Sequence, residues 1–185
     1  MKSEIRSQKS EARSPKFVFL CLLSTIYCLL SCSIPNLEDA NCSQAKEPVK
    51  SFYSYHFGNE MDFGRENIVK KEKFLTPEFY KLVIYELDRQ ERFVKENADQ
   101  VPFINGDPFT DSQEYPTSFR IGKCAVVEPN KVVIEVLMFW KFQVGSDQRE
   151  MKIEVFKQDD KWLINDFVDG ENKSLQKLFS REKYQ

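Results

Sequence analysis

Hydrophobic positions along the chain change their spacing near its middle. Before residue 100, apolar side chains recur every three or four positions, which is the period of an amphipathic helix. After residue 117 they alternate with polar residues or form short runs rich in Val, Ile, Phe and Trp, as is typical of strands. This order predicts an α+β fold in which N-terminal helices cover one face of a curved antiparallel sheet.

Two helices stand out in the first half. The first begins at Pro48, a residue suited to the first helical turn, and ends at Gly58. The second begins after Thr76, which can cap a helix, and continues to about Asn97. The apolar face of the first helix consists of Val49, Phe52, Tyr53, His56 and Phe57.

A shorter, lysine-rich helix is predicted between these two. It starts at Ile68 and runs into Phe74 and Leu75. Acidic residues alternate with its basic ones, so we expect its lysines to form a solvated face. These lysines are Lys70, Lys71 and Lys73.

The second half predicts a four-stranded meander and a short C-terminal helix. The four strand-like runs are 118–128, 131–144, 148–158 and 161–169. The segments between them are short enough for hairpins and rich in turn residues: Pro129-Asn130, Gly145-Ser146-Asp147 and Asp159-Asp160. A last apolar repeat from Ser174 to Phe179 predicts a helix that packs back on the core.

The N-terminus has the pattern of a secretory signal peptide, over residues 1–31. Five basic residues precede an uncharged run of 14 residues, Phe17–Leu30. That run is shorter than the roughly 20 apolar residues of a spanning helix. We therefore expect export, followed by a polar tether over 32–46 and a single domain over 47–185.

The end of this run resembles the lipobox of bacterial lipoproteins. It reads Leu29-Leu30-Ser31-Cys32, in which Cys32 would carry the lipid, although Leu30 stands where a smaller residue is usual. Several acyl chains hold a protein firmly on a membrane. Ser33, in place of an Asp, favours an outer-membrane lipoprotein that faces the periplasm or the cell surface. Simple secretion and an uncleaved anchor are the alternatives.

Charge and cysteine content argue against nucleic-acid binding and zinc binding, and they suggest a disulfide. Removing the five basic and two acidic residues before Cys32 leaves 22 basic and 27 acidic, which argues against a nucleic-acid partner. No Cys or His spacing fits a zinc site, and we expect neither metal nor cofactor. Cys42 and Cys124, 82 residues apart, are a candidate disulfide. The alternative is two unpaired thiols, one in the tether and one in a core strand.

Several short motifs, in order, resemble a known family. They are Ser51-Phe52-Tyr53-Ser54-Tyr55, Leu75-Thr76-Pro77, Gly106-Asp107-Pro108-Phe109 with Gln113, and Lys161-Trp162-Leu163-Ile164-Asn165-Asp166-Phe167. The family is domain of unknown function 3828, which includes envelope lipoproteins of the YbjP type and is similar to the nuclear transport factor 2-like superfamily. The resemblance implies a cone of helices in a bent sheet and an envelope location, but no activity.

The polar stretch from Asn105 to Gly122 joins the two halves and is the predicted recognition site. A ligand or partner would meet Asp107, Phe109, Gln113, Tyr115, Arg120 and Trp140. The structural alternative is that Asp107 caps the next turn and Phe109 closes the mouth of the cone. Gln113 and Tyr115 would then satisfy backbone groups of the loop.

An enzyme would need His56, the only histidine, as its base. Asp166 is its candidate partner for a lyase or isomerase reaction, because alternation places this carboxylate on the apolar face of the last strand. A hydrogen-bonded core histidine and a structural pair of Asp166 with Arg120 or Tyr115 are the expected readings. We therefore predict a lipid-anchored envelope binding or scaffold domain without catalysis, which recognises another envelope protein or a small apolar ligand. An immunity-type inhibitor is a further alternative.

Overall fold

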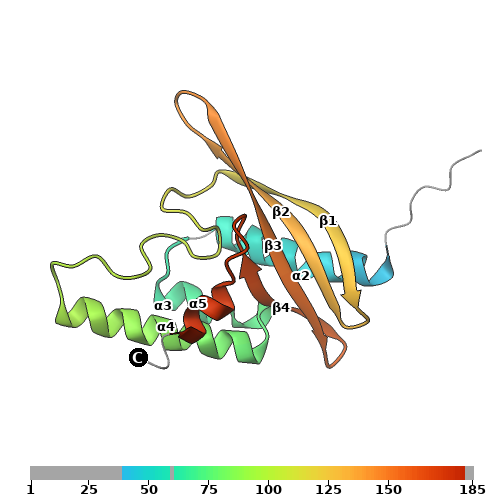
Figure 1. Ribbon diagram of the computed structural model, residues 1–185, viewed down its shortest axis with the longest axis horizontal. Helices are drawn as coiled ribbons and strands as arrows, with labels where there is room; N and C mark the ends of the chain where they lie inside the picture. Colours follow the sequence, from blue (N-terminus) through green and yellow to red (C-terminus); the bar gives the residue numbers. More distant parts are fainter. Residues whose placement is uncertain (1–38, 59–60, 182–185) are drawn as a thin grey trace, which may run out of the picture. The chain divides into compact units, whose positions relative to one another are not determined.

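The computed structural model describes residues 39–58 and 61–181, all within one compact unit that begins at Glu38. Among these residues, four helices and a 3₁₀ turn accompany a four-stranded sheet (Figure 1). The helical elements are α2 (Ala40–Phe57), α3 (Arg65–Val69), η1 (Glu72–Phe74), α4 (Pro77–Glu96) and α5 (Leu175–Arg181). The strands are β1 (Ser118–Glu128), β2 (Lys131–Lys141), β3 (Ser146–Gln158) and β4 (Lys161–Val168). The predicted α+β order of helices, antiparallel sheet and short C-terminal helix is confirmed.

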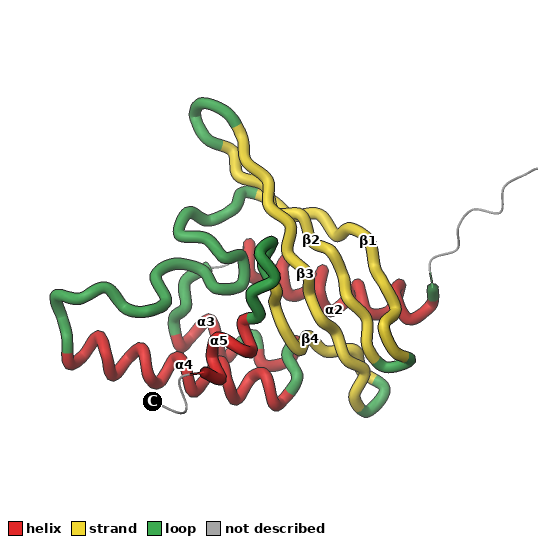
Figure 2. The backbone as a smooth tube through the Cα atoms, in the orientation of Figure 1, coloured by secondary structure: helices red, strands yellow, loops and turns green. Residues whose placement is uncertain are grey.

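The sheet is the predicted meander, with strand order β1-β2-β3-β4 and antiparallel pairing throughout. Alternate residues of β2 are buried against the helices, from Val132 to Trp140. In a meander, the β1–β2 and β3–β4 turns lie at one end of the sheet and the β2–β3 turn at the other (Figure 2). We call these the disulfide end and the hairpin end.

The helix α2 begins at Ala40, eight residues before the predicted start at Pro48. Asp39 caps it by accepting a hydrogen bond from the Asn41 N–H at 2.8 Å. Pro48 therefore lies inside the helix, where it lacks the N–H that would bond to the preceding turn. The helix continues because the sheet buries Cys42 and Ala45, which extend its apolar face. The prediction of a polar tether as far as Lys46 is wrong from Ala40 onward.

The connection between α2 and α4 also departs from the prediction. The helix expected from Ile68 is the short α3, which starts at Arg65, followed by the separate turn η1. Lys71 lies between them and is fully buried, so a solvated face is the wrong assignment for this lysine. The start of α4 is as predicted, because Thr76 Oγ1 accepts from the Phe79 N–H at 3.3 Å.

A disulfide joins Cys42 of α2 to Cys124 of β1, with their Cα atoms 5.7 Å apart. Cys124 pairs in the sheet with Ile134, close to the β1–β2 turn. The bond therefore attaches the first turn of α2 to the disulfide end of the sheet. The candidate pairing of these two cysteines is confirmed.

Aromatic rings fill the space between the helices and the sheet. Phe52 and Phe109 each lie 5.1 Å from Phe167, measured between ring centroids, and 5.4 Å from one another. Phe79 packs on the other side of Phe167 at 5.9 Å. All four side chains are at most 1% exposed, so packed aromatic rings form the core of the domain.

The turn between β2 and β3 projects from the hairpin end (Figure 1). β2 ends at Lys141 and β3 starts at Ser146, so the predicted runs 131–144 and 148–158 shift by two or three residues. All residues from 141 to 150 are exposed. Among the described residues, no helix is long and apolar enough to cross a membrane. The predicted signal peptide and Cys32 lie outside the described residues.

Candidate functional site

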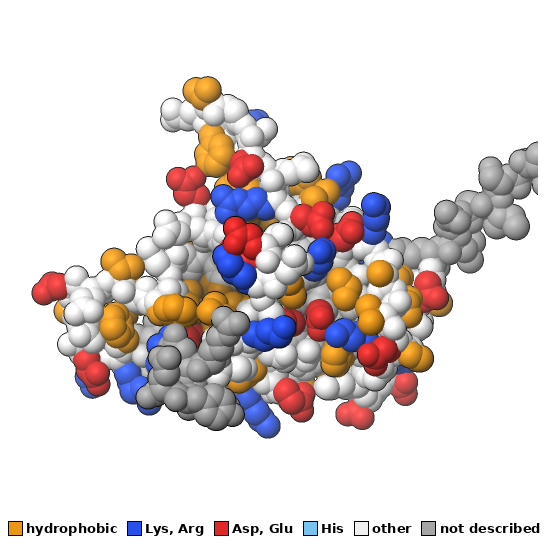
Figure 3. Space-filling view, viewed as in Figure 1, with side chains coloured by type: hydrophobic (Ala, Val, Ile, Leu, Met, Phe, Trp, Pro, Cys, Tyr) orange, Lys and Arg blue, Asp and Glu red, His pale blue; other side chains and the backbone are white. Residues whose placement is uncertain are grey.

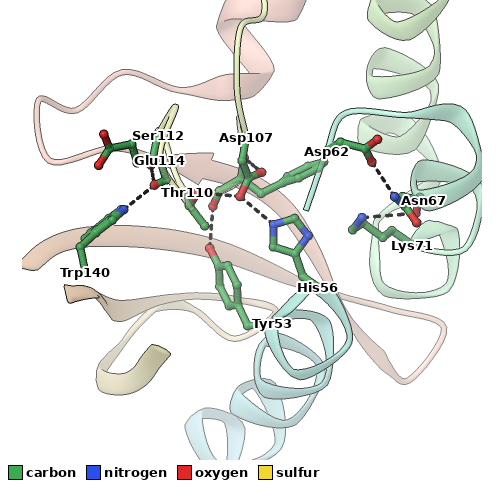
Figure 4. Close-up of polar contacts among 11 residues, drawn as sticks. Tyr53, His56, Asp62, Asn67, Lys71, Asp107, Thr110, Ser112, Glu114 and Trp140 are labelled. Carbon is green, nitrogen blue, oxygen red and sulfur yellow. Dashed lines mark hydrogen bonds and ion pairs between the residues drawn. The ribbon is translucent and has the colours of Figure 1, made fainter. Parts of the chain in front are cut away.

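The carboxylate of Asp107 organises the loop that precedes β1 (Figure 4). Its Oδ1 accepts from the Phe109 N–H at 3.0 Å, and its Oδ2 accepts from the Thr110 hydroxyl at 2.6 Å. The predicted capping role of Asp107 is thus confirmed. Gly106 precedes it with φ +121°, and a Cβ there would meet the Ser112 carbonyl oxygen at 2.4 Å. The tight turn therefore requires glycine at this position.

His56 of α2 reaches the same carboxylate. Its Nε2 lies 2.7 Å from Asp107 Oδ2, and both side chains are fully buried. Because a carboxylate can only accept, Nε2 carries the proton and donates it. The other ring nitrogen, Nδ1, has no hydrogen-bond partner among the residues that the structure describes. In Figure 4 the ring lies between Asp107 and Lys71. The expected hydrogen-bonded core histidine is confirmed, with Asp107 as its partner.

Two further buried polar side chains border this pair. Tyr53 donates its hydroxyl to the Phe109 carbonyl oxygen at 2.9 Å, and burial, with a contribution from Asp107, raises its pKa well above the usual value. Lys71 Nζ donates to the Asn67 carbonyl oxygen at 3.3 Å and lies 5.8 Å from the centre of the Phe109 ring. Burial lowers the pKa of Lys71 to about 8, against the opposing effect of Asp107.

This buried cluster is a clamp that holds the loop on α2. General acid–base chemistry needs a substrate atom within hydrogen-bond reach of the base. His56 is instead enclosed by the rings of Phe52 at 5.6 Å and Phe109 at 5.7 Å. Phe109 itself is fully buried, as the structural reading of the loop predicts. The geometry therefore favours a structural role for this cluster.

Asp166 does not form the predicted pair with His56. Its Oδ1 accepts from the N–H groups of Phe167 and Gln176, each at 2.8 Å, and its Oδ2 accepts from the Ser174 hydroxyl. Burial raises the pKa of this carboxyl group, and these hydrogen bonds oppose the rise. The carboxylate thus caps α5 from the end of β4.

The expected partners of Asp166 were Arg120 and Tyr115, and this prediction is wrong. Arg120 lies on β1 with its guanidinium 6.0 Å from the centre of the Phe139 ring. Short-range capping explains the outcome, because Asp166 is eight residues from Ser174 and the chain turns back between them. The proposed catalytic combination of His56 with Asp166 is not assembled.

Three adjoining hollows lie on the outside of the domain, and all three include Asp111. The first, of about 280 Å³, is lined by Pro108, Asp111, Met151, Phe167, Asp169, Asn172, Lys173, Ser174, Leu175, Lys177 and Leu178. The second, of about 300 Å³, is lined by Phe103 to Pro108, Asp111 to Gln113, Leu175 and Leu178. The third, of about 340 Å³, is lined by Asp111 to Glu114, Trp140, Phe142 and Arg149. We call this continuous depression the Asp111 groove.

The groove combines charge with exposed apolar side chains. Asp111 has φ 49°, and burial, followed by the nearby Asp169, raises the pKa of its carboxyl group. Phe103 is 54% exposed and Leu178 37%, while Val101 close by is 69% exposed. Figure 3 shows hydrophobic side chains exposed on this face of the molecule. The groove therefore offers an apolar contact area with a polar border.

The predicted recognition residues divide between the core and this groove. Gln113 lines two of the hollows. Trp140 borders the third but is 3% exposed, donating its ring N–H to the Glu114 carbonyl oxygen beneath the Arg149 guanidinium. Asp107 and Phe109 are buried, so the side chains cannot meet a partner. Gln113 and Tyr115 are both exposed.

Sequence reasoning missed Val101, Phe103 and Leu178 as exposed apolar residues. A signal existed for Phe103, which lies in a connection without helical or strand periodicity. In the part of the chain that the structure describes, no group of three or more His, Cys, Asp or Glu residues is placed to hold a metal ion.

Comparisons with known proteins leave the function open. No protein family and no curated protein matches the chain in sequence. Among solved structures, it is similar to the crystal structure of a protein of unknown function from Bacteroides thetaiotaomicron VPI-5482. The two are 14% identical over 81% of this chain and 98% of that chain, with a TM-score of 0.43. A likeness at this level carries no argument about activity.

Proposed function

We propose that the protein is an exported, lipid-anchored binding domain of the bacterial envelope, which recognises a segment of another envelope protein in the Asp111 groove. The observation that carries this proposal is the pair of exposed apolar side chains that line the second hollow of the groove, Phe103 and Leu178. Apolar patches bordered by polar residues are typical of protein interaction sites.

A protein segment suits this domain better than a small apolar ligand. Enclosed apolar ligands need an interior cavity, but Phe52, Phe79, Phe109 and Phe167 fill the space between helices and sheet. The described hollows lie outside this core and open to solvent. The sealed environment of His56 likewise favours binding over lyase or isomerase chemistry.

Anchoring and family membership are part of the same proposal. The charged N-terminal segment, the run Phe17–Leu30 and Cys32 support a lipid anchor, in the outer membrane because Ser33 follows the cysteine. The order of elements, with helices followed by an antiparallel meander, is compatible with a nuclear transport factor 2-like cone and with domain of unknown function 3828. Metabolic labelling with a clickable fatty acid should mark the wild-type protein and not the Cys32→Ala variant.

Site-specific photo-cross-linking in intact cells tests the recognition site. A photoreactive amino acid is placed at Phe103 or Leu178, with Val69 as the matched control, because Val69 is 48% exposed and lines none of the three hollows. We expect a protein adduct from the two groove positions and none from Val69. Adducts of equal yield at all three positions, or at none, would overturn the proposed site. A toxin as the captured partner would assign the protein to the immunity-type inhibitors.

A further inference from the structure

The disulfide end of the sheet carries exposed aliphatic side chains. Val126 is 43% exposed and Val127 54%, although both belong to β1. They precede the exposed turn residue Pro129, so apolar groups point outward on both sides of the strand end. In Figure 3 hydrophobic side chains are visible among charged ones at this end of the sheet. We call Val126, Val127 and Pro129 the valine tip.

The chain enters the domain close to this tip. Asp39 is three helical residues from Cys42, a rise of about 5 Å. The disulfide brings the Cα atoms of Cys42 and Cys124 to within 5.7 Å. Val126 follows two strand residues later, about 7 Å further on. The start of α2 and the valine tip are therefore covalently held at the same end of the domain.

The segment that precedes α2 limits how far this end can move from a lipid anchor. Only six residues lie between Cys32 and Asp39, and the seven steps from one Cα atom to the next span at most about 25 Å in an extended chain. If Cys32 is acylated, the disulfide end cannot leave the neighbourhood of the bilayer. This step rests on the lipid anchor of the proposed function.

We infer that the valine tip rests on the lipid surface and orients the domain on the membrane. Two valines and a proline alone would bind a bilayer weakly, because the membrane affinity of a side chain grows with its buried apolar area. The short tether makes the second contact intramolecular and raises its effective concentration. The charges at this end do not add up to a basic patch, because Lys123 and Glu128 carry opposite charges and the β3–β4 turn at the same end contains the exposed Asp159 and Asp160. Apolar contact rather than net charge therefore makes the attachment.

The meander makes this orientation relevant to recognition. The β1–β2 turn and the β2–β3 turn lie at opposite ends of the sheet. Trp140, Phe142 and Arg149 of the Asp111 groove belong to the hairpin end. A domain that rests on its valine tip therefore presents this part of the groove away from the bilayer, toward a partner in the adjoining compartment.

Photo-labelling of lipids tests the inference on the mature, full-length protein. The processed protein is reconstituted in vesicles of phosphatidylethanolamine and phosphatidylglycerol, with a diazirine amino acid at Val126 or Val127. The matched control is Val144, a valine in the β2–β3 turn that is 92% exposed. After illumination, intact-mass spectrometry measures both the acyl chains on Cys32 and any additional lipid adduct.

We expect lipid adducts at Val126 and Val127 to exceed those at Val144 at least fivefold. Equal lipid labelling at the three positions, in a protein that carries its acyl chains, would overturn the orientation and leave the anchor intact. Adducts between two copies at Val127 would also overturn it, and would assign the tip to self-association. A processed protein without acyl chains would overturn both the anchor and this inference.

Discussion

Asp107 is the residue that joins the loop to the helices. Its carboxylate accepts from His56 Nε2, the Phe109 N–H and the Thr110 hydroxyl, and the side chain is fully buried. Polar groups buried in this way stabilise a unique structure only while every partner is present. Substitution of Asp107 alone should therefore test whether this cluster holds the loop on α2.

Replacing Asp107 with Ala should lower the free energy of unfolding by about 3–5 kcal/mol, because His56, the Thr110 hydroxyl and the Phe109 N–H would remain buried without their acceptor. Urea denaturation followed by circular dichroism measures the change. Asp99→Ala is the control, since Asp99 is an exposed acid and its loss should cost less than about 0.5 kcal/mol. A loss below about 1 kcal/mol for Asp107→Ala would contradict the clamp.

The buried charge of Lys71 destabilises the folded protein, so its deprotonation should increase the free energy of unfolding as the pH rises from 8 to 10. Its pKa is about 8 in the folded protein and 10.5 in the unfolded chain, so the unfolded chain binds more protons within this window. Stability then increases with pH. Lys71→Met removes the buried charge and should raise the free energy of unfolding at pH 7 by about 2 kcal/mol, a gain that shrinks toward pH 10.

The measurement for Lys71 is the difference in free energy of unfolding between wild type and variant at pH 7, 8, 9 and 10. Subtracting the two removes the effects of groups that both proteins share, including Tyr53, which titrates above this window. Lys81→Met serves as control because Lys81 is exposed. A difference that does not vary with pH would show that Lys71 keeps its ordinary pKa.

At the scale of elements, α2 depends on attachments at both of its ends. Pro48 weakens the helix internally, since a proline within a helix costs about 3 kcal/mol relative to alanine. The Asp39 cap and the disulfide from Cys42 stabilise the turns that precede it, and His56 is held by Asp107 in the last turn. The N-terminal part of α2 should therefore be lost first when the disulfide is removed.

The double variant Cys42→Ala, Cys124→Ala should lose about 4 kcal/mol of stability, because the disulfide closes a loop of 82 residues in the unfolded chain. Chemical denaturation with and without reductant provides the measurement. Reductant should destabilise the wild type to a similar extent and leave the variant unchanged. Free thiols in the oxidised, denatured wild type would contradict the pairing.

At the scale of the whole molecule, stability and recognition depend on different surfaces. The aromatic core is closed, while the Asp111 groove opens at the outside with Phe103 and Leu178 exposed. Substitutions in the groove should consequently affect binding without unfolding the domain. Core substitutions should do the reverse.

Phe103→Asp should change the free energy of unfolding by less than about 0.5 kcal/mol, as is usual for surface substitutions. It should nevertheless abolish the protein adduct formed from a photoreactive group at Leu178. Phe109→Ala, in the core, should cost about 3–5 kcal/mol. If Phe103→Asp destabilised the domain as strongly as Phe109→Ala, the groove would belong to the core and not to a recognition surface.

Local chemistry in the sequence determined the order of helices and strands, the hairpin turns and the start of α4 at Thr76. These features depend on periodicity and turn residues within a few positions, and they are confirmed. The two cysteines of the domain also made the disulfide a candidate, and the structure confirms it over the alternative of two unpaired thiols. The order of the elements could thus be predicted from the sequence. Of the candidate site, only the loop that contributes to it could be predicted, and not the exposed side chains that line the groove.

Tertiary structure decided which distant residues meet. It placed Asp107 against His56, 51 residues away, and used Asp166 to cap α5. It extended α2 back through Pro48 to Ala40 and buried Lys71, against the local preference of each residue. Burial and pairing across the chain outweigh helix propensities, which differ by at most about 1 kcal/mol for most residues and by about 3 kcal/mol for a proline inside a helix. Such pairings depend on the packed arrangement of all elements, which no local sequence pattern specifies.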